Sequence, residues 1–363
     1  MDAAPHNPPN RIALIRPSAL GDVCRTVPVL TSLRRSFPDA EIDWIVQDTF
    51  ADAIRAHPDL TSVIPFARQR FSRIWRSVRV AREWLAWSKS LRRRDYDLVF
   101  DLQGLARSGL IAFLTRAPRR VGFADAREGG RLGYTVRHAI PAAMHTVDRM
   151  LALVQAEGVE AVRDMRLYVP DDAAAWWNAQ RERHGLTAGG YMVIAPTSRW
   201  PAKRWPAERF VALAQHLLAT GDERIVLVGG REERLQIQPL LDLAARESRI
   251  IDLIGATTVG GLMAVIAPSS LLIANDSAAL HMAVGFGRPY VALFGPTDVS
   301  LVGPYGGREW VIQPPVDPSR LNHKDAALGS SIMERISVEQ VIERIEQRLA
   351  EQSTSNPHPA AQH

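Results

Sequence analysis

Leu271-Leu-Ile-Ala-Asn-Asp-Ser-Ala-Ala-Leu-His-Met-Ala-Val-Gly-Phe-Gly-Arg-Pro-Tyr-Val-Ala-Leu-Phe-Gly-Pro-Thr-Asp298 is the stretch that decides the fold. It contains an apolar run (271–274), a polar turn, an apolar helical run (278–284) and a second apolar run (290–294). This order predicts a βαβ unit, in which ligand groups lie at the carboxyl ends of parallel strands. Main-chain N–H groups at the start of the helix favour an anion there.

Two side chains of this stretch support an anion site. Ser277 precedes the helix and can either cap it or bind a phosphate oxygen. His281 follows four residues later, so the two side chains share one helix face. The alternative is a capped core helix with a satisfied histidine. We favour the anion site because the Asn-Asp-Ser and Gly-Pro-Thr turns lie at the same edge of the sheet.

The alternation of apolar strands with amphipathic helices extends over most of the chain and predicts an α/β fold. The two halves resemble each other, which indicates two Rossmann-like sheets. The predicted organisation is a disordered N-terminus (1–10), an N-terminal Rossmann-like domain (11–168), a hinge (169–190), a C-terminal Rossmann-like domain (191–335), a C-terminal helix packing back toward the N-terminal domain (336–351) and a disordered tail (352–363).

Composition limits the class of protein. The chain has 363 residues, 46% of them hydrophobic, which suffices for two domains with full cores. Its one cysteine, Cys24, excludes an internal disulfide. The start lacks an apolar signal core and no run approaches the ~20 apolar residues of a spanning helix, so we expect a soluble or peripheral protein without export. The net charge of +5 indicates acidic partners.

The stretch 68–94 carries much of the positive charge, with ten basic residues against one acid, Glu83. Apolar residues recur at helical spacing, and Trp75, Trp84 and Trp87 are interleaved. A basic amphipathic helix of this kind can lie on an anionic membrane. Equally, it can be a solvated helix whose tryptophans reach the core. Nucleic acid is the least favoured partner because no nucleic-acid motif accompanies the charge.

Polar residues follow the predicted strands in both halves. The first half offers a carboxylate and basic groups, and the second offers hydroxyls, a lysine and carboxylates that suit a nucleotide diphosphate and its ribose. The sequence contains neither a GxGxxG after a strand nor a GxxxxGK[ST] loop, which disfavours a dinucleotide enzyme and a P-loop protein. It also has no Cys/His metal spacing, so we expect neither a metal nor a cofactor.

Five motifs carry a family resemblance over residues 11–350. They are Ser18-Ala-Leu-Gly-Asp22, Asp101-Leu-Gln-Gly104, Lys203-Arg-Trp-Pro206, Asn275-Asp-Ser with His281, and Phe294-Gly-Pro-Thr-Asp298. In this order they resemble the ADP-heptose lipopolysaccharide heptosyltransferases of glycosyltransferase family 9, and the segments 124–128 and 145–149 look most like the heptosyltransferase I branch. The resemblance implies the GT-B fold, two Rossmann-like domains facing across a cleft, with the acceptor in the N-terminal and the donor in the C-terminal half.

The resemblance also implies roles for individual residues in an inverting, metal-independent transfer of heptose. Asp22 is the expected base, and Lys203 is expected to neutralise the departing diphosphate. The predicted donor-binding residues are Thr197, Ser198, Lys203, Glu232, Glu233, Asp276, Ser277, Ala278 and His281, with Glu232 or Glu233 on the ribose. The predicted acceptor-binding residues are Arg68, Arg70, Arg73, Gln103, Arg127, His145 and Arg149.

The implied partners are ADP-heptose and an acidic, lipid-linked Kdo/lipid A-type acceptor, without nucleic acid. The implied location is the cytoplasm, peripheral on the inner face of the inner membrane. Ala278 stands where the family usually has glycine, and the loop 197–203 is longer than in close relatives. Two alternatives therefore remain: a family 9 enzyme with another nucleotide sugar or polysaccharide acceptor, and a catalytically silent protein that binds a nucleotide sugar or a lipid surface.

Overall fold

Two parallel six-stranded sheets form the framework of the computed structural model, which describes residues 8–322 and 324–355. The chain divides into two units, Met1–Pro170 and Asp171–His363, and each unit contains one sheet. The strands are short, nearly continuous apolar runs, as expected for parallel strands covered on both faces. The predicted α/β class with two Rossmann-like sheets is confirmed.

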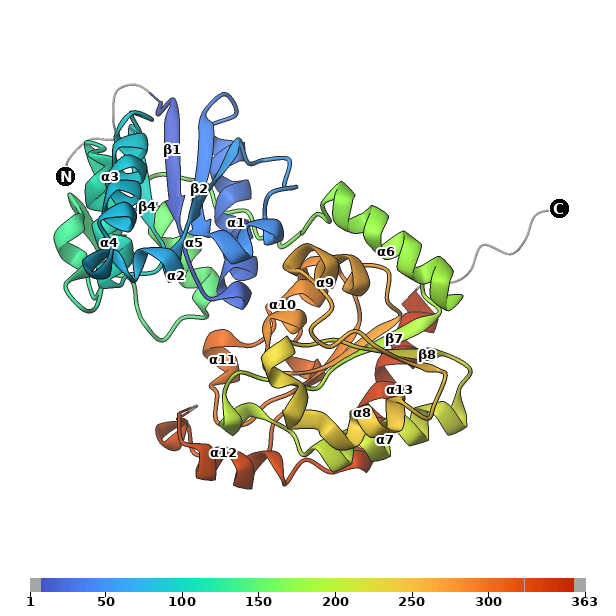
Figure 1. Ribbon diagram of the computed structural model, residues 1–363. Helices are drawn as coiled ribbons and strands as arrows, with labels where there is room; N and C mark the ends of the chain where they lie inside the picture. The colour runs from blue at the N-terminus through green and yellow to red at the C-terminus, as the bar shows by residue number, and fades with distance from the viewer. Residues whose placement is uncertain (1–7, 323, 356–363) are drawn as a thin grey trace. The chain divides into compact units, whose positions relative to one another are not determined.

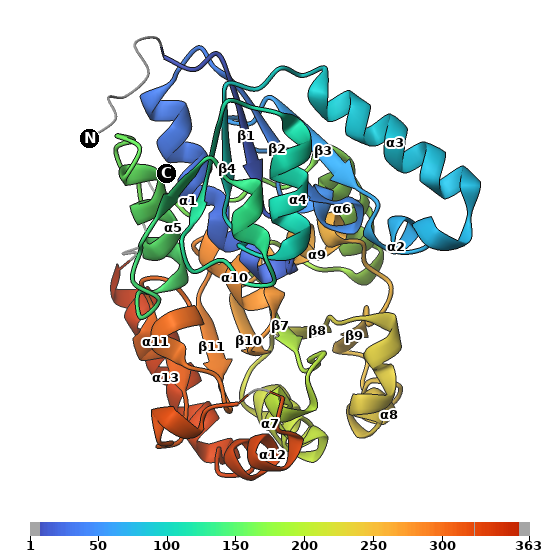
Figure 2. The same cartoon turned by 90° about the vertical axis from the view of Figure 1, so that its left-hand side faces the viewer.

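In the first unit the strand order is β3-β2-β1-β4-β5-β6. The strands are β1 Arg11–Ile15, β2 Glu41–Gln47, β3 Ser62–Phe66, β4 Leu98–Asp101, β5 Arg119–Phe123 and β6 Val136–His138. The helices are α1 Leu20–Ser36, α2 Arg68–Phe71, α3 Val78–Arg92, α4 Ala106–Thr115 and α5 Thr146–Gln155. Figures 1 and 2 show α1 beside α5 and α3 beside α4.

The second unit repeats this order, as β12-β11-β10-β7-β8-β9. Its strands are β7 Tyr191–Ala195, β8 Arg224–Leu227, β9 Ile250–Asp252, β10 Leu271–Asn275, β11 Tyr290–Leu293 and β12 Val311–Ile312. Its helices are α6 Asp171–His184, α7 Ala207–Thr220, α8 Gln238–Ala244, α9 Val259–Ile266, α10 Ala278–Gly285, α11 Val299–Val302, α12 Ala326–Met333 and α13 Val338–Ser355. The βαβ unit predicted from 271–298 is β10-α10-β11.

The basic stretch is not one helix. It forms α2, a 3-10 turn η2 (Ile74–Arg76) and α3, which Ser77 begins by accepting a hydrogen bond from Val80 N. Trp84 and Trp87 pack with Phe66 and Phe71 against the core beneath α3. Trp75 instead is exposed. The core interpretation therefore holds for two of the three tryptophans.

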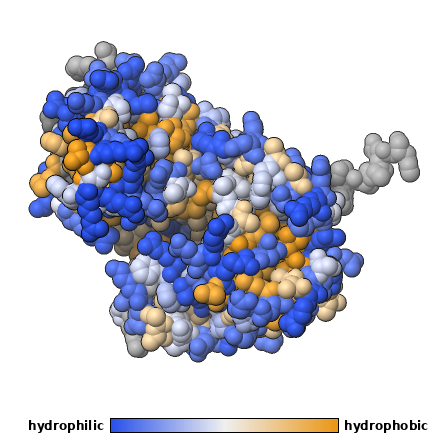
Figure 3. All heavy atoms as spheres, in the orientation of Figure 1, coloured by the Kyte–Doolittle hydropathy of each residue, from blue (hydrophilic) through white to orange (hydrophobic). Residues whose placement is uncertain are grey.

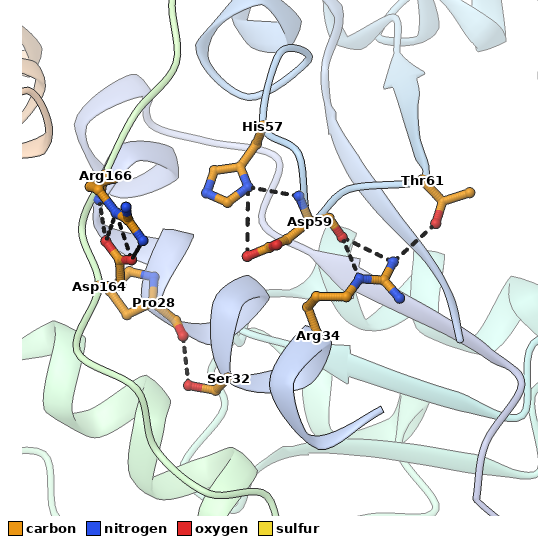
Figure 4. Close-up of polar contacts among 8 residues, drawn as sticks. All are labelled: Pro28, Ser32, Arg34, His57, Asp59, Thr61, Asp164 and Arg166. Atoms are coloured by element: carbon orange, nitrogen blue, oxygen red, sulfur yellow. Dashed lines mark hydrogen bonds and ion pairs between the residues drawn. The ribbon is translucent and has the colours of Figure 1, made fainter. Parts of the chain in front are cut away.

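The segment before residue 170 packs against the first unit, and Figure 4 shows its residues Asp164 and Arg166 near His57. His57 is buried, packs edge-on against Tyr168 at 4.9 Å between ring centroids, and hydrogen-bonds the main chain of Arg166. Burial lowers the pKa of His57, which keeps the ring neutral at pH 7. The Ser32 hydroxyl accepts from Val162 N at 2.8 Å, which adds a second contact between this segment and α1.

Two predicted boundaries differ from the structure. Helix α6 lies within the predicted hinge (169–190), but it packs on α9, and its Trp177 donates to the Tyr191 hydroxyl at 3.0 Å within the second unit. Helix α13 places Val341 and Ile345 in the core of the second unit, and its contact with the N-terminal domain stays a prediction. The predicted tail is wrong for 352–355, which are helical, while 1–7 and 356–363 lie outside the described residues.

Candidate active site

The strand order reverses once in each sheet, between β1 and β4 and between β7 and β10. Open parallel sheets bind ligands outside the carboxyl ends of the strands at such a reversal, because the crossover helices diverge to opposite faces there. Asp22 follows β1 and the Asp101–Gly104 loop follows β4. Lys203 follows β7 and Asp276 follows β10. The residues singled out from the sequence thus flank both reversal points.

Asp22 lies in the first turn of α1, where its carboxylate accepts a hydrogen bond from Ala19 N at 3.1 Å. Arg16 forms an ion pair with it at 3.1 Å, and Arg25 donates a second, shorter contact. Burial by itself raises the pKa of Asp22, but the two guanidinium charges and the hydrogen bonds outweigh it and hold the pKa well below its usual range. The carboxylate is therefore ionised and fixed, and it caps the helix as well.

Gln103 is positioned by a buried carboxylate. Asp101 accepts hydrogen bonds from Gln103 N at 2.9 Å and Gly104 N at 3.1 Å, and from the Tyr134 hydroxyl at 2.5 Å. Burial raises the pKa of Asp101. The loop fixed in this way places the Gln103 amide 3.3 Å from the Ser18 hydroxyl, so Gln103 lies beside the loop that leads to Asp22.

The other predicted acceptor residues have different surroundings. Arg149 binds Asp125 at 2.5 and 2.6 Å and lies over the Phe123 ring at 4.2 Å, so it forms an ion pair within the first unit. His145 caps α5 by accepting from Val147 N at 3.2 Å. Arg127 N donates to Gly104 O at 2.9 Å, which joins the loop after β5 to the loop after β4.

The three arginines of α2 and the following turn are near the surface. Arg70 forms an ion pair with Glu83 of α3. Burial lowers the pKa of Arg107 on α4, and the positive charge of Arg68 lowers it further. These two arginines are therefore close enough to repel each other. Arg73 is exposed. Of the seven predicted acceptor residues, Gln103 and Arg127 are the ones tied directly to the loop after β4.

In the second unit, Lys203 Nζ donates to Asp276 Oδ2 at 2.6 Å, and the two side chains are only 14% and 9% exposed. Asn275, which sequence reasoning assigned no role, fixes this arrangement. Its amide donates to Pro196 O at 2.6 Å and accepts from Trp205 N at 3.2 Å, so the end of β10 is joined to both ends of the loop that carries Lys203. The signal in the sequence that could have identified Asn275 was its place in the Asn-Asp-Ser turn.

Two buried hydroxyls at the ends of β10 and β11 have no hydrogen-bond partner among the described residues: Ser277 Oγ and Thr297 Oγ1. Ser277 is the residue before α10, but its side chain does not cap that helix. Ala278 begins α10, and His281 is buried on it. An unpaired buried hydroxyl costs free energy, which a ligand oxygen can recover. Ser277 therefore fits the anion interpretation better than the cap.

The two carboxylates predicted to bind the ribose, Glu232 and Glu233, differ in their hydrogen bonds and exposure. Glu233 accepts from the Thr197 hydroxyl at 2.6 Å and from Gly230 N at 3.0 Å, so the loop after β8 is joined to the loop after β7. Glu232 is exposed. Ser198 is buried, and its N–H donates to Gln236 at 3.3 Å. Either carboxylate can still accept a ribose hydroxyl.

Within residues 8–322 and 324–355, no three His, Cys, Asp or Glu side chains are grouped so that they could hold a metal ion. In the same part of the chain, we find no helix both long enough and apolar enough to cross a bilayer.

Sequence comparison places this chain in a known class. The model of glycosyltransferase family 9 (heptosyltransferase) matches residues 84–326, and the chain belongs to this family. It is therefore a glycosyltransferase, of the heptosyltransferase family of lipopolysaccharide core synthesis.

Individual relatives support the assignment to this family. Lipopolysaccharide heptosyltransferase 1 of Pseudomonas aeruginosa is 30% identical over 82% of this chain and 81% of its own length. The protein of the same name from Escherichia coli K12 is 29% identical over 84% of this chain and 94% of its own length. The structure of E. coli heptosyltransferase WaaC with ADP-2-deoxy-2-fluoro heptose superimposes with a TM-score of 0.73 and 26% identity, over 93% of this chain and 99% of that chain. The GT-B fold is thereby confirmed.

Proposed function

We propose that this protein transfers heptose from ADP-heptose to a Kdo/lipid A-type acceptor in lipopolysaccharide inner-core synthesis, with inversion and without a metal. The observation that carries the proposal is the Lys203–Asp276 pair at the reversal point of the second sheet, together with the unpaired Ser277 and Thr297 hydroxyls that follow β10 and β11. This group of one lysine, hydroxyls and the amino end of α10 suits a diphosphate. The similar WaaC structure contains an ADP-heptose analogue.

In the proposed reaction, the Asp22 carboxylate accepts the proton of an acceptor hydroxyl as its oxygen attacks the anomeric carbon. The bond from that carbon to the diphosphate oxygen breaks, and ADP leaves with the bonding electron pair. Attack from the side opposite to the leaving group inverts the anomeric configuration. A positioned base is typically worth ~10²–10⁴ in rate.

The charge that develops on the leaving diphosphate is neutralised by protein groups in this proposal. Lys203 supplies a positive charge, while the Ser277 and Thr297 hydroxyls and the first N–H groups of α10 supply hydrogen bonds. Groups fixed before the reaction stabilise the transition state without a cost of reorganisation. Such a set takes the place of a metal ion.

The acceptor in the proposal is acidic and linked to lipid, which explains the arginines of the first unit. Arg127 is joined to the loop after β4 and Arg149 contacts the end of β5, and planar guanidinium groups bind carboxylates and phosphates through two parallel hydrogen bonds. An acceptor of this kind places the enzyme at the inner face of the inner membrane.

A direct test is incubation of purified protein with ADP-heptose and a defined Kdo acceptor, followed by mass spectrometry. We expect a mass increase of one heptose and an equal release of ADP, and both should persist in EDTA. The anomeric configuration of the product, read by NMR, tests inversion. Transfer from another nucleotide sugar in a donor panel, but not from ADP-heptose, would overturn the donor assignment. Binding of ADP-heptose without any ADP release would show a silent binding protein.

A further inference from the structure

An exposed apolar surface occurs on the first unit, on elements other than α1, which carries Asp22, and the loop that carries Gln103. Among the described residues, six of the eight large apolar side chains that are exposed lie between 75 and 132: Trp75, Val78, Leu85, Leu110, Phe113 and Leu132. Trp75 is 92% and Leu132 77% exposed. Scattered apolar residues are normal at a surface, whereas exposed apolar side chains gathered on neighbouring elements mark an interaction site.

These side chains belong to elements that pack together. Helix α4 contacts α3, and the 3-10 turn η3 (Gly130–Gly133) packs on α4. The contact between α4 and η3 is so close that a Cβ on Gly109 would lie 2.2 Å from Gly130 O. Figure 3 shows hydrophobic residues among hydrophilic ones on the side of the first unit that carries α3 and α4.

Basic side chains alternate with the apolar ones. Along α3 the exposed residues at intervals of three and four are Val78, Arg82, Leu85, Lys89 and Arg92. The opposite side of α3 carries Trp84, Trp87 and Leu91, which are anchored in the core. Arg107 on α4 and Arg131 on η3 extend the positive charge. The helix is thus fixed with its mixed apolar and basic side toward solvent. We name this surface, Trp75 to Leu132 with its interspersed arginines and lysine, the apolar–basic face.

We propose that the apolar–basic face docks on an anionic phospholipid bilayer. Tryptophan, leucine and phenylalanine side chains enter the boundary between headgroups and acyl chains, while arginine and lysine side chains reach the lipid phosphates. A partner that offered phosphates alone would leave the apolar side chains in water. Binding to a bilayer requires no sugar transfer. The inference rests on the proposed function only in its consequence, because docking would bring a lipid-linked acceptor within reach of the enzyme.

The test is flotation of the full-length protein with vesicles of phosphatidylcholine alone or with phosphatidylglycerol added. We expect binding to the anionic vesicles that weakens between 0.1 and 1 M NaCl, as the screening length falls from ~10 to ~3 Å. Each basic residue near such a surface contributes about fivefold, so Arg82→Gln/Lys89→Gln should weaken partitioning about 25-fold. Leu110→Ser/Phe113→Ser should weaken partitioning onto the vesicles about tenfold or more, and should reduce the fraction of binding that persists at 1 M NaCl.

Matched controls come from the second unit, where Leu235 is exposed and Arg183 is exposed. Leu235→Ser and Arg183→Gln should bind vesicles as the wild type does. All of these variants should transfer sugar to a soluble acceptor fragment at the wild-type rate, which separates this inference from the proposed function. Equal binding to neutral and anionic vesicles, or unchanged binding by both double variants, would overturn it. A concentration-dependent dimer abolished by Leu110→Ser/Phe113→Ser, without vesicle binding, would instead assign the face to a second copy of the chain.

Discussion

Lys203 and Asp276, 73 residues apart in the chain, form a 2.6 Å ion pair at the point where the strand order of the second sheet reverses. Each belongs to a loop that follows one of the two strands at that point. The pair joins these loops and leaves both charges largely buried. In the proposed function this positive charge binds a ligand phosphate, and Asp276 supplies its counter-charge within the protein.

Removing one member of this pair should destabilise the protein. We expect Lys203→Met to lower the free energy of unfolding by about 3–5 kcal/mol, because Asp276 is left as an uncompensated buried charge. The control is Lys203→Met/Asp276→Asn, which removes both charges and should recover most of the stability while remaining inactive. Urea unfolding and a transfer assay measure the two properties. Equal stability of the single and double variants would contradict the pairing.

Asp22 should contribute to stability in a pH-dependent way. Its pKa is depressed in the folded state, so its stabilisation is present above the unfolded value of ~3.9 and is lost as the pH falls through the folded value. We therefore expect Asp22→Asn to be less stable than wild type at pH 7, with a difference that shrinks below about pH 4. Denaturation at several pH values tests this. A difference that grew on acidification would refute the sign.

The same depressed pKa predicts the pH profile of transfer. Because Asp22 stays ionised, the rate should show no acid limb from this residue between about pH 5 and 8. In Arg25→Gln one of the two positive charges beside the carboxylate is removed, so the pKa of Asp22 rises and an acid limb should move toward the measured range.

Asp22→Ala should reduce transfer ~10²–10⁴-fold while ADP still binds. Wild-type transfer by that variant would reject the base assignment.

A glycine on α12 should control the position of Lys203. A Cβ on Gly329 would lie 2.3 Å from the Cα of Ala202, in the 3-10 turn η4 (Pro201–Lys203). We expect Gly329→Val to push this turn outward, to weaken ADP binding at least about tenfold and to cost about 1–3 kcal/mol of stability. Ser330→Val, exposed on the same helix, is the control and should bind ADP normally. Calorimetric titration with ADP makes the comparison.

The tryptophans of the basic stretch should differ in their effect on stability. Trp84 is packed among Phe66, Phe71 and Trp87, so Trp84→Ala should lower the free energy of unfolding by about 3–5 kcal/mol. Trp75 is exposed, and Trp75→Ala should change it by less than about 0.5 kcal/mol. Thermal unfolding of the two variants compares them. Equal losses would show that Trp75 is also packed.

Much of the site could be predicted because a parallel sheet places strand ends together. Once the strands were recognised, Asp22, Lys203 and Asp276 had to follow strands at a carboxyl edge. Their partners could not be predicted. Arg16 and Arg25 are two among many arginines, and nothing in local spacing shows that both turn toward Asp22. Asn275 was visible in its motif, but its bonds to Pro196 and Trp205 span about 70 residues or more.

The sequence by itself determined the α/β class, the two-unit organisation and the motifs of the family, because these depend on local periodicity and on turns read directly from neighbouring residues. Tertiary structure alone decided which charges pair, which hydroxyls at the strand ends are left unpaired, and which of three tryptophans remains in solvent. Those outcomes depend on contacts between residues far apart in the chain, where burial and electrostatic pairing, rather than local propensity, set the lowest free energy.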